Sequence, residues 1–304
     1  MSGDGYFPRE TSILRRVQEE RAVGLLYGQR ALMLGAMASP LSYYGTAAHT
    51  AAQAKPFQRL THTAMMFEAV FFGSSDEADK ALAFVERLHR RVKGKLPQAL
   101  GPWPAGTPYS AFDPELMLTG VVAPTFDSAL VIHEALVRRL DDDQRERMWQ
   151  DYLRFGKLFG MPRDAAPATY LEFRDWWDRR LDTEEVFLTD EARQAGYETG
   201  FAIPVPALNR PAMRGLEFLL LGLLPERARE LYGLGWNGAR QRAFDAAALA
   251  IRRGAPLAPG LLRRGSCKFF FDVVAKAERD RIRAGRGSGM FAADGTPAAE
   301  RSAA

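Results

Sequence analysis

The sequence predicts an all-α fold, a multi-helix orthogonal bundle. Three observations favour this class: apolar residues recur at helical spacing along most of the chain, several segments begin with helix-capping residues, and alternating strand patterns are scarce. Of the 304 residues, 47% are hydrophobic and 26% are charged, which is the balance of an ordinary globular protein. A chain of this length has enough apolar material to enclose a bulky cofactor.

The first part of the chain is expected to consist of consecutive helices. Ser74 followed by Glu77 has the spacing of a capping box, and the helix that it opens is predicted to continue until Gly94. Apolar spacing predicts the helices before it at about 12–22, 24–38 and 57–72.

A long helix is predicted over residues 114–138. It begins at Asp113 and Pro114, because an Asp cap and a Pro in the first turn both suit the unpaired N–H groups of a helix start. Pro124 lies inside this helix and lacks a backbone N–H group. We therefore expect a kink or a break close to Gly120.

The second half of the chain contains further capping signals. Asp143 followed by Glu146 predicts the start of a helix that Gly160 ends. Thr169 followed by Glu172 predicts the start of the next one. Apolar spacing predicts additional helices at about 210–222, 237–253 and 267–284.

The irregular stretches indicate how the chain is organised. Residues 95–113 form a long Pro- and Gly-rich connection, and such loops often have a functional role. A break at 202–211 precedes a C-terminal helical part at 210–283. We predict a single helical domain over 1–283 and a disordered tail at 284–304.

Composition excludes several classes of protein and site. The single Cys267 excludes an intramolecular disulfide framework, a Cys-based zinc site and covalently attached haem. Residues 1–10 lack the apolar region of a signal peptide. The longest apolar runs are shorter than the ~18 residues of a membrane span. The expectation is a soluble, cytoplasmic protein with no membrane span.

The net charge of +4 comes largely from basic residues late in the chain. Asp272, Glu278 and Asp280 are interleaved with them, and no aromatic stacking pattern accompanies the charge. We interpret this segment as a solvated helix face and expect no nucleic acid as a partner.

His89 is the most informative of the four histidines. It continues the apolar stripe of its predicted helix, which turns it inward. A neutral imidazole in an apolar pocket is a good iron ligand, and a helical bundle can enclose the planar, apolar haem. The alternative is a core histidine bonded to a backbone carbonyl, and this helix alone favours that alternative. The stripe consists of Ala78, Leu82, Val85, His89 and Val92.

A polar trio on the preceding helix changes that balance. Arg59, His62 and Thr63 are spaced so that they share one helix face. An antiparallel pair joined by a turn near Gly73 would bring this face towards His89. A cation, an imidazole and a hydroxyl suit a distal haem pocket. The alternative is a solvated face.

A di-iron site is disfavoured. Glu86 precedes His89 by three residues, as in ferritin-like bundles. Such sites need two of these motifs and two further helical carboxylates, and no other histidine here has a Glu three residues before it.

Several segments, taken together and in order, resemble the MpaB/rubber-oxygenase family, which includes the latex-clearing proteins. The resemblance covers roughly residues 10–180. The matching stretches are LLYGQRALMLGAMASPLSYYG (25–45), PFQRLTHTAMMFEAVFFGSSDEA (56–78), VERLHRRVKG (85–94), YSAFDPELMLTGVV (109–122), FDSALVIHEAL (126–136) and FGKLFGMP (155–162).

This resemblance implies a bundle that encloses a non-covalent haem b between its helices. It implies an oxygenase that uses O2 to oxidise an apolar small molecule, with or without cleavage of a C=C bond. Nothing in the sequence requires a flavin or nicotinamide site, so any electron donor is expected to be external. By the same resemblance His89 is the axial ligand of the haem iron. Arg59, His62 and Thr63 match the family's distal Arg-x-x-Lys-Thr run, with His in the Lys position. Arg30 matches an arginine suited to pairing with a haem propionate.

Two departures from the family pattern bear on function. Ser39 and Val122 stand where many relatives have histidine. Two alternatives to an oxygenase therefore remain: a non-catalytic protein that binds haem or another small molecule, and a haem-free helical scaffold.

Overall fold

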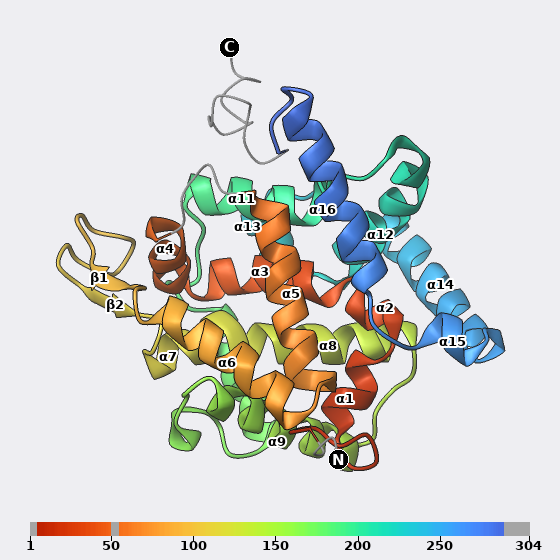
Figure 1. Cartoon of the computed structure of the whole chain (residues 1–304), viewed down its shortest axis with the longest axis horizontal. Helices are drawn as coiled ribbons and strands as arrows, with labels where there is room; N and C mark the ends of the chain where they lie inside the picture. The colour runs from red at the N-terminus through yellow and green to blue at the C-terminus, as the bar shows by residue number, and fades with distance from the viewer. Residues whose placement is uncertain (1–4, 50–54, 289–304) are drawn as a thin grey trace.

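The computed structural model describes residues 5–49 and 55–288, and it confirms the all-α prediction (Figure 1). Helices follow one another along the described chain and cross at steep angles. Beside them lies one small antiparallel sheet of two strands, β1 (Lys93–Lys95) and β2 (Pro108–Ser110).

The N-terminal region contains shorter helices than the apolar spacing predicts over 12–22 and 24–38. The backbone of Ser39 leaves the helical region (φ −140°, ψ 69°), and Pro40 begins a helix that the sequence analysis does not anticipate. Pro suits this position because the first N–H of a helix has no partner. The helices are α1 (Ile13–Gln18), α2 (Arg21–Gly24), α3 (Tyr27–Ala38) and α4 (Pro40–Ala48).

Helices α5 (Pro56–Phe72) and α6 (Ser75–His89) form the expected antiparallel pair. The capping box is confirmed, since Glu77 N donates to Ser74 Oγ at 3.3 Å and Ser74 N donates to Glu77 Oε2 at 2.9 Å.

The prediction that this helix continues to Gly94 is wrong. Helix α6 ends at His89, and Gly94 pairs with Tyr109 in the hairpin of β1 and β2. The connection predicted over 95–113 therefore contains a strand.

A continuous helix through Pro114–Leu136 crosses the core. It consists of α7 (Pro114–Met117), a π-helical turn η1 (Leu118–Val122) and α8 (Ala123–Leu136). The irregularity expected near Pro124 is this π turn. A Cβ on Gly35 of α3 would lie only 2.5 Å from the carbonyl oxygen of Gly120, so glycine allows the two helices to cross closely.

By length and composition alone, the helix Pro114–Leu136 could span a membrane. No uninterrupted apolar run in the sequence is long enough to do so. In the structure, 78% of the most apolar 18-residue stretch of this helix is buried. Such burial is typical of the core helix of a soluble domain.

The next helices are α9 (Asp142–Leu158), α10 (Tyr170–Leu181) and α11 (Asp190–Phe201). The box predicted at Asp143 and Glu146 is wrong: Asp141 caps α9, and its carboxylate accepts a bond from Gln144 N at 2.8 Å. The box at the start of α10 is confirmed. Large aromatic side chains from α8, α9 and α10 form the centre of the core, namely Phe126, Trp149, Tyr152, Phe155, Phe173 and Trp177.

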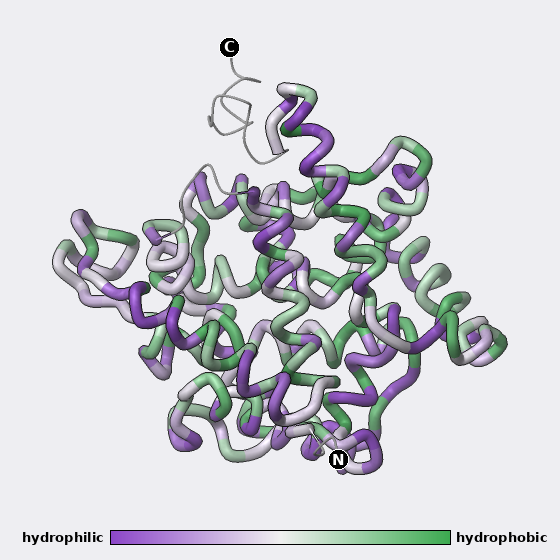
Figure 2. Tube along the Cα trace, in the orientation of Figure 1, coloured by the Kyte–Doolittle hydropathy of each residue, from purple (hydrophilic) through white to green (hydrophobic). Residues whose placement is uncertain are grey.

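The C-terminal part returns to the front of the bundle. Helix α16 lies along α5, far from it in sequence (Figure 1). Figure 2 shows that the beginning of α16 is hydrophobic and its far end hydrophilic. Of the tail predicted over 284–304, residues 289–304 lie outside the described residues. The helices here are α12 (Arg210–Leu223), α13 (Glu226–Leu231), α14 (Gly238–Gly254), α15 (Gly260–Arg263) and α16 (Lys268–Arg283), with short 3-10 turns at η2 (Arg163–Ala165), η3 (Ala207–Asn209) and η4 (Ala255–Leu257).

Candidate functional site

His89 is the last residue of α6 and is partly buried. Its ring lies 6.2 Å from that of Phe112 in an edge-on arrangement. Burial lowers the pKa of His89 below its ordinary value of 6.5, so the imidazole is neutral at pH 7. Its ring nitrogens form no hydrogen bond with the residues that the structure describes. A neutral, unpaired imidazole is the donor that haem iron takes from a protein.

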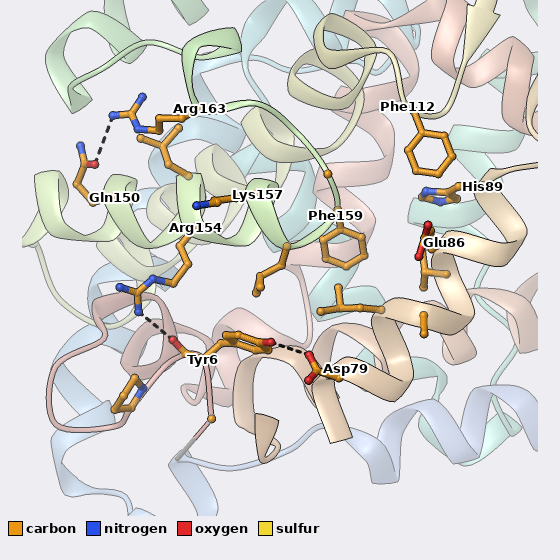
Figure 3. Close-up of a pocket in the computed structure, with 18 residues that line it drawn as sticks. Tyr6, Asp79, Glu86, His89, Phe112, Gln150, Arg154, Lys157, Phe159 and Arg163 are labelled. Atoms are coloured by element: carbon orange, nitrogen blue, oxygen red, sulfur yellow. Dashed lines mark hydrogen bonds between the residues drawn. The ribbon is translucent and has the colours of Figure 1, made fainter. Parts of the chain in front are cut away.

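The ring of His89 opens on a cavity of about 1100 Å³ (Figure 3). Phe159 and other apolar side chains lie in its middle, and three cationic side chains from α9 and the turn after it lie on the side away from His89. This volume reaches the upper end of the range for cofactor sites, about 300–1,000 Å³. The cations are Arg154, Lys157 and Arg163.

The N-terminal segment closes one side of this first cavity. Tyr6 donates from its hydroxyl to Asp79 Oδ1 at 2.6 Å, and Arg154 Nη1 donates to the carbonyl oxygen of Tyr6 at 3.0 Å (Figure 3). The imidazole, the apolar wall and the cations fit a haem, because they match its iron, its ring and its two propionates. The two carboxylates that also line the cavity accept hydrogen bonds from other side chains, Asp79 from Tyr6 and Glu86 from Arg90.

Arg59, His62 and Thr63 are all exposed on α5. Protein atoms around the Arg59 guanidinium nevertheless lower its pKa by desolvation, while the Tyr43 phenol of α4 raises it. Arg59 therefore lies near Tyr43 of α4. His62 forms no hydrogen bond with the described residues. The helix pair is arranged as predicted, but the trio does not line the cavity of His89.

Thr63 instead lines a second cavity of about 210 Å³, enclosed by α3, α5, the π turn, α8, α11 and α16. Its wall is mostly apolar. Leu32 and Val121 face this cavity with 44% and 38% of their surface exposed, which is unusual for large apolar side chains inside a helical bundle.

The threonines of the second cavity do not make it polar, because each hydroxyl donates to a backbone carbonyl. Thr63 donates to Arg59 O at 3.2 Å, Thr125 to Val121 O at 2.7 Å, Thr199 to Ala195 O at 2.7 Å and Thr61 to Phe271 O at 3.5 Å. With these protons already used, the hydroxyls have little to donate to a ligand, and the cavity suits an apolar molecule.

Arg30 lies away from both cavities and is 2% exposed. Its Nη1 donates to Asp127 Oδ2 at 2.7 Å and to Ser128 Oγ at 3.0 Å, and its Nε donates to Leu223 O at 2.8 Å. These bonds join α3, α8 and the end of α12. We therefore assign Arg30 a structural role in place of the predicted propionate contact.

Two further polar groups, Glu198 and Tyr43, were not identified from the sequence. Glu198 of α11 is buried, and burial raises its pKa to about 7, against the effect of its bond from Gln194. It follows no capping or metal motif and lies in a helix that the sequence analysis does not predict. Tyr43 lies near Arg59. Ser39 is buried, and its hydroxyl has no partner among the described residues.

Residues 5–49 and 55–288 contain no group of three or more His, Cys, Asp or Glu side chains placed to hold a metal ion. His89 therefore has no second metal-ligating side chain grouped with it among these residues, and the arrangement does not resemble a di-iron site.

Comparison with known proteins identifies the family. Two mycobacterial proteins, the uncharacterised protein Rv2237 of Mycobacterium tuberculosis and the uncharacterised protein Mb2261 of Mycobacterium bovis, are each 27% identical to this chain over 233 residues, which cover 76% of the chain and 86% of each relative. No solved structure matches the chain significantly. The profile described as ER-bound oxygenase mpaB/B'/Rubber oxygenase, catalytic domain, matches residues 15–253. The protein therefore belongs to the mpaB/rubber oxygenase catalytic-domain family.

Proposed function

We propose that this protein is a haem b-dependent oxygenase that uses O2 to oxidise an apolar small molecule. Membership in an oxygenase catalytic-domain family supports the oxygenase role. The observation that carries the haem assignment is His89, whose neutral ring has no hydrogen bond among the described residues and opens on the large cavity. The second, apolar cavity supports an apolar substrate.

In this proposal His89 holds the iron through one ring nitrogen. Phe112 packs edge-on against that ring and limits its rotation. Cations for the propionates are available on α9, where Lys157 has no hydrogen bond with the described residues. Haem, when bound, supplies the activation of oxygen, with electrons from an external donor.

We assign Arg59 and His62 of α5 to the oxygen side of the site, as the resemblance implies, although neither lines the cavity of His89 in the structure. Arg59 has a fixed positive charge, and His62 has both ring nitrogens available, so these two are the donors to an oxygen ligand. Thr63 donates its proton to Arg59 O at 3.2 Å. Its role is therefore to hold the backbone and the wall of the second cavity.

The test is haem content, measured by the pyridine haemochrome method on protein from haem-supplemented cells. We expect about one haem per chain in the wild type and almost none in His89→Ala. His62→Ala should keep its haem and lose turnover. His49→Ala, on the helix end of α4, is the matched control and should keep both. Normal haem content in His89→Ala would refute the ligand assignment.

A non-catalytic binding protein is the second candidate, favoured by the loss of two family histidines. Ser39 and Val122, which replace them, are both buried at 2% exposure or less. In that case the haem spectrum would respond to added ligands while no apolar compound stimulates oxygen uptake. A colourless protein that also refuses added haem would point to a helical scaffold.

A further inference from the structure

Helix α16 lies outside residues 15–253, which match the family, yet it contacts α5 along its length. Glu278 of α16 is fully buried. Its carboxylate accepts bonds from the backbone N–H groups of Phe57 at 3.1 Å and Gln58 at 2.7 Å. These are among the unpaired donors at the start of α5, and a carboxylate there is stabilised by the helix dipole.

At the opposite end of the α5–α16 pair, α5 supplies the carboxylate and the start of α16 supplies the donors. Glu68 of α5 accepts bonds from Cys267 N at 3.1 Å and Ser266 Oγ at 2.5 Å, at the start of α16. Each helix therefore supplies a carboxylate to the N-terminus of the other. The two antiparallel helices are held in register at both ends.

Between these two contacts, α16 forms a wall of the second cavity. The side chains of Phe270, Phe271 and Val274 line it, and the carbonyl of Phe271 accepts a bond from Thr61 of α5 at 3.5 Å. Phe269 turns the other way: it is 56% exposed and lies 5.6 Å from the Arg21 guanidinium. The same helix thus presents one aromatic group to solvent and two to the cavity.

We propose that α16 is the specificity wall of the apolar cavity, and that Phe271 and Val274 set the length of the apolar molecule that it accepts. A dry cavity of about 150 Å³ takes the six carbons of benzene, so 210 Å³ holds an apolar molecule of roughly eight carbon atoms. As a statement about substrate, this rests on the proposed function. As a statement about ligand binding, it does not require haem.

The experiment measures binding of a series of n-alkylbenzenes to the full-length protein by calorimetry. For the wild type we expect affinity to rise about fourfold for each added methylene, as apolar burial predicts, and to fall beyond about eight carbons. Phe271→Ala should move this limit to chains longer by about four carbons, because a ring is removed from the wall. Val274→Phe should move it to shorter chains.

Phe269→Ala is the matched control, since it removes the same ring from the outer face of the same helix. It should leave the length limit unchanged. Equal limits in Phe269→Ala and Phe271→Ala, or a Val274→Phe variant that binds the whole series like the wild type, would overturn the proposal. If Phe271→Ala fails to fold, Val274→Phe still decides.

Haem content, measured on the same variants, separates this proposal from the proposed function. A shifted length limit with no haem in any variant would uphold the wall and reject the oxygenase. Full haem content with an unshifted length limit would support the haem-dependent function and reject the specificity wall.

Discussion

The cavity of His89 and the apolar cavity beside it are neighbours but differ in size and in chemistry. The first, of about 1100 Å³, has an unpaired imidazole at one end and cations at the other. The second, of about 210 Å³, has threonines whose protons are already donated to carbonyls. Phe67 lines the second cavity and lies 6.0 Å from the ring of Phe159, which lines the first. Under the proposed function, this difference assigns the first cavity to the haem and the second to the apolar molecule.

The largest expected effect tests whether the cavities act independently. His89→Ala should remove almost all haem, because the protein then lacks its iron ligand. It should leave alkylbenzene binding in the second cavity within about twofold of the wild type, since His89 does not line it. Absorption spectra and calorimetry on the same preparation measure both. Joint loss of haem and of alkylbenzene binding, in a variant that remains folded, would show that the two cavities are one site.

The Arg30→Ala variant tests whether Arg30 binds a propionate in the first cavity or stabilises the packing of the helices. Arg30→Ala should lower the free energy of unfolding by about 3–5 kcal/mol, because it leaves Asp127 without its buried partner. Urea unfolding measures this, and we expect haem content per folded molecule to stay unchanged. Near-normal stability with reduced haem content would restore the predicted propionate contact.

Acid titration tests a second histidine, His133, which is buried in the core. Burial, with the nearby Arg138, lowers the pKa of His133 from 6.5 to about 4, and its Nδ1 has no partner among the described residues. Between these values the unfolded state binds the proton and the folded state does not. Stability is therefore lost as pH falls from about 6.5 to about 4, by up to about 3 kcal/mol.

Unfolding measured across this pH range tests the contribution of His133. His133→Asn should flatten the dependence, because the variant has no imidazole to titrate. His62→Ala is the control and should retain the wild-type slope, since His62 is exposed. An unchanged slope in His133→Asn would place the acid sensitivity elsewhere.

The smallest effects concern two glycines of α3. Gly35→Ala should cost about 1–3 kcal/mol, because its Cβ would lie 2.5 Å from the carbonyl oxygen of Gly120. Gly28 lines the second cavity, and a Cβ there meets no atom within 4 Å. Gly28→Ala should therefore raise stability by roughly 0.5–1 kcal/mol and slightly weaken the binding of the longest alkylbenzenes. Thermal unfolding measures the stability of both variants. If Gly35→Ala and Gly28→Ala changed the stability equally, α3 and the π turn would be further apart than the structure indicates.

Much of the helical pattern could be predicted, and the errors have local causes. The boxes that start α6 and α10 follow a Ser or Thr with a Glu three residues on, and both are present. At α9 the same rule fits Asp141 and Asp143, and neighbouring residues do not choose between them. The length of α6 was overestimated because Gly94 pairs with Tyr109, fifteen residues later.

Whether a candidate residue could be placed from the sequence also depends on whether its contacts are local or distant along the chain. His89 could be found because its apolar stripe is a property of one helix, where spacing of three and four residues brings side chains together. The partner of Arg30 is 97 residues away, and nothing near Arg30 indicates it. That Thr63 lines a different cavity from His89 likewise depends on helices distant in sequence.

Periodicity and capping residues were enough to predict a mainly helical chain, the pairing of α5 and α6, and the partial burial of His89. These features depend on interactions over a few residues, which a sequence displays directly. The two cavities and the wall formed by α16 could not be read in this way. Glu278 and Phe57 are 221 residues apart, and such contacts exist only after the whole chain has packed.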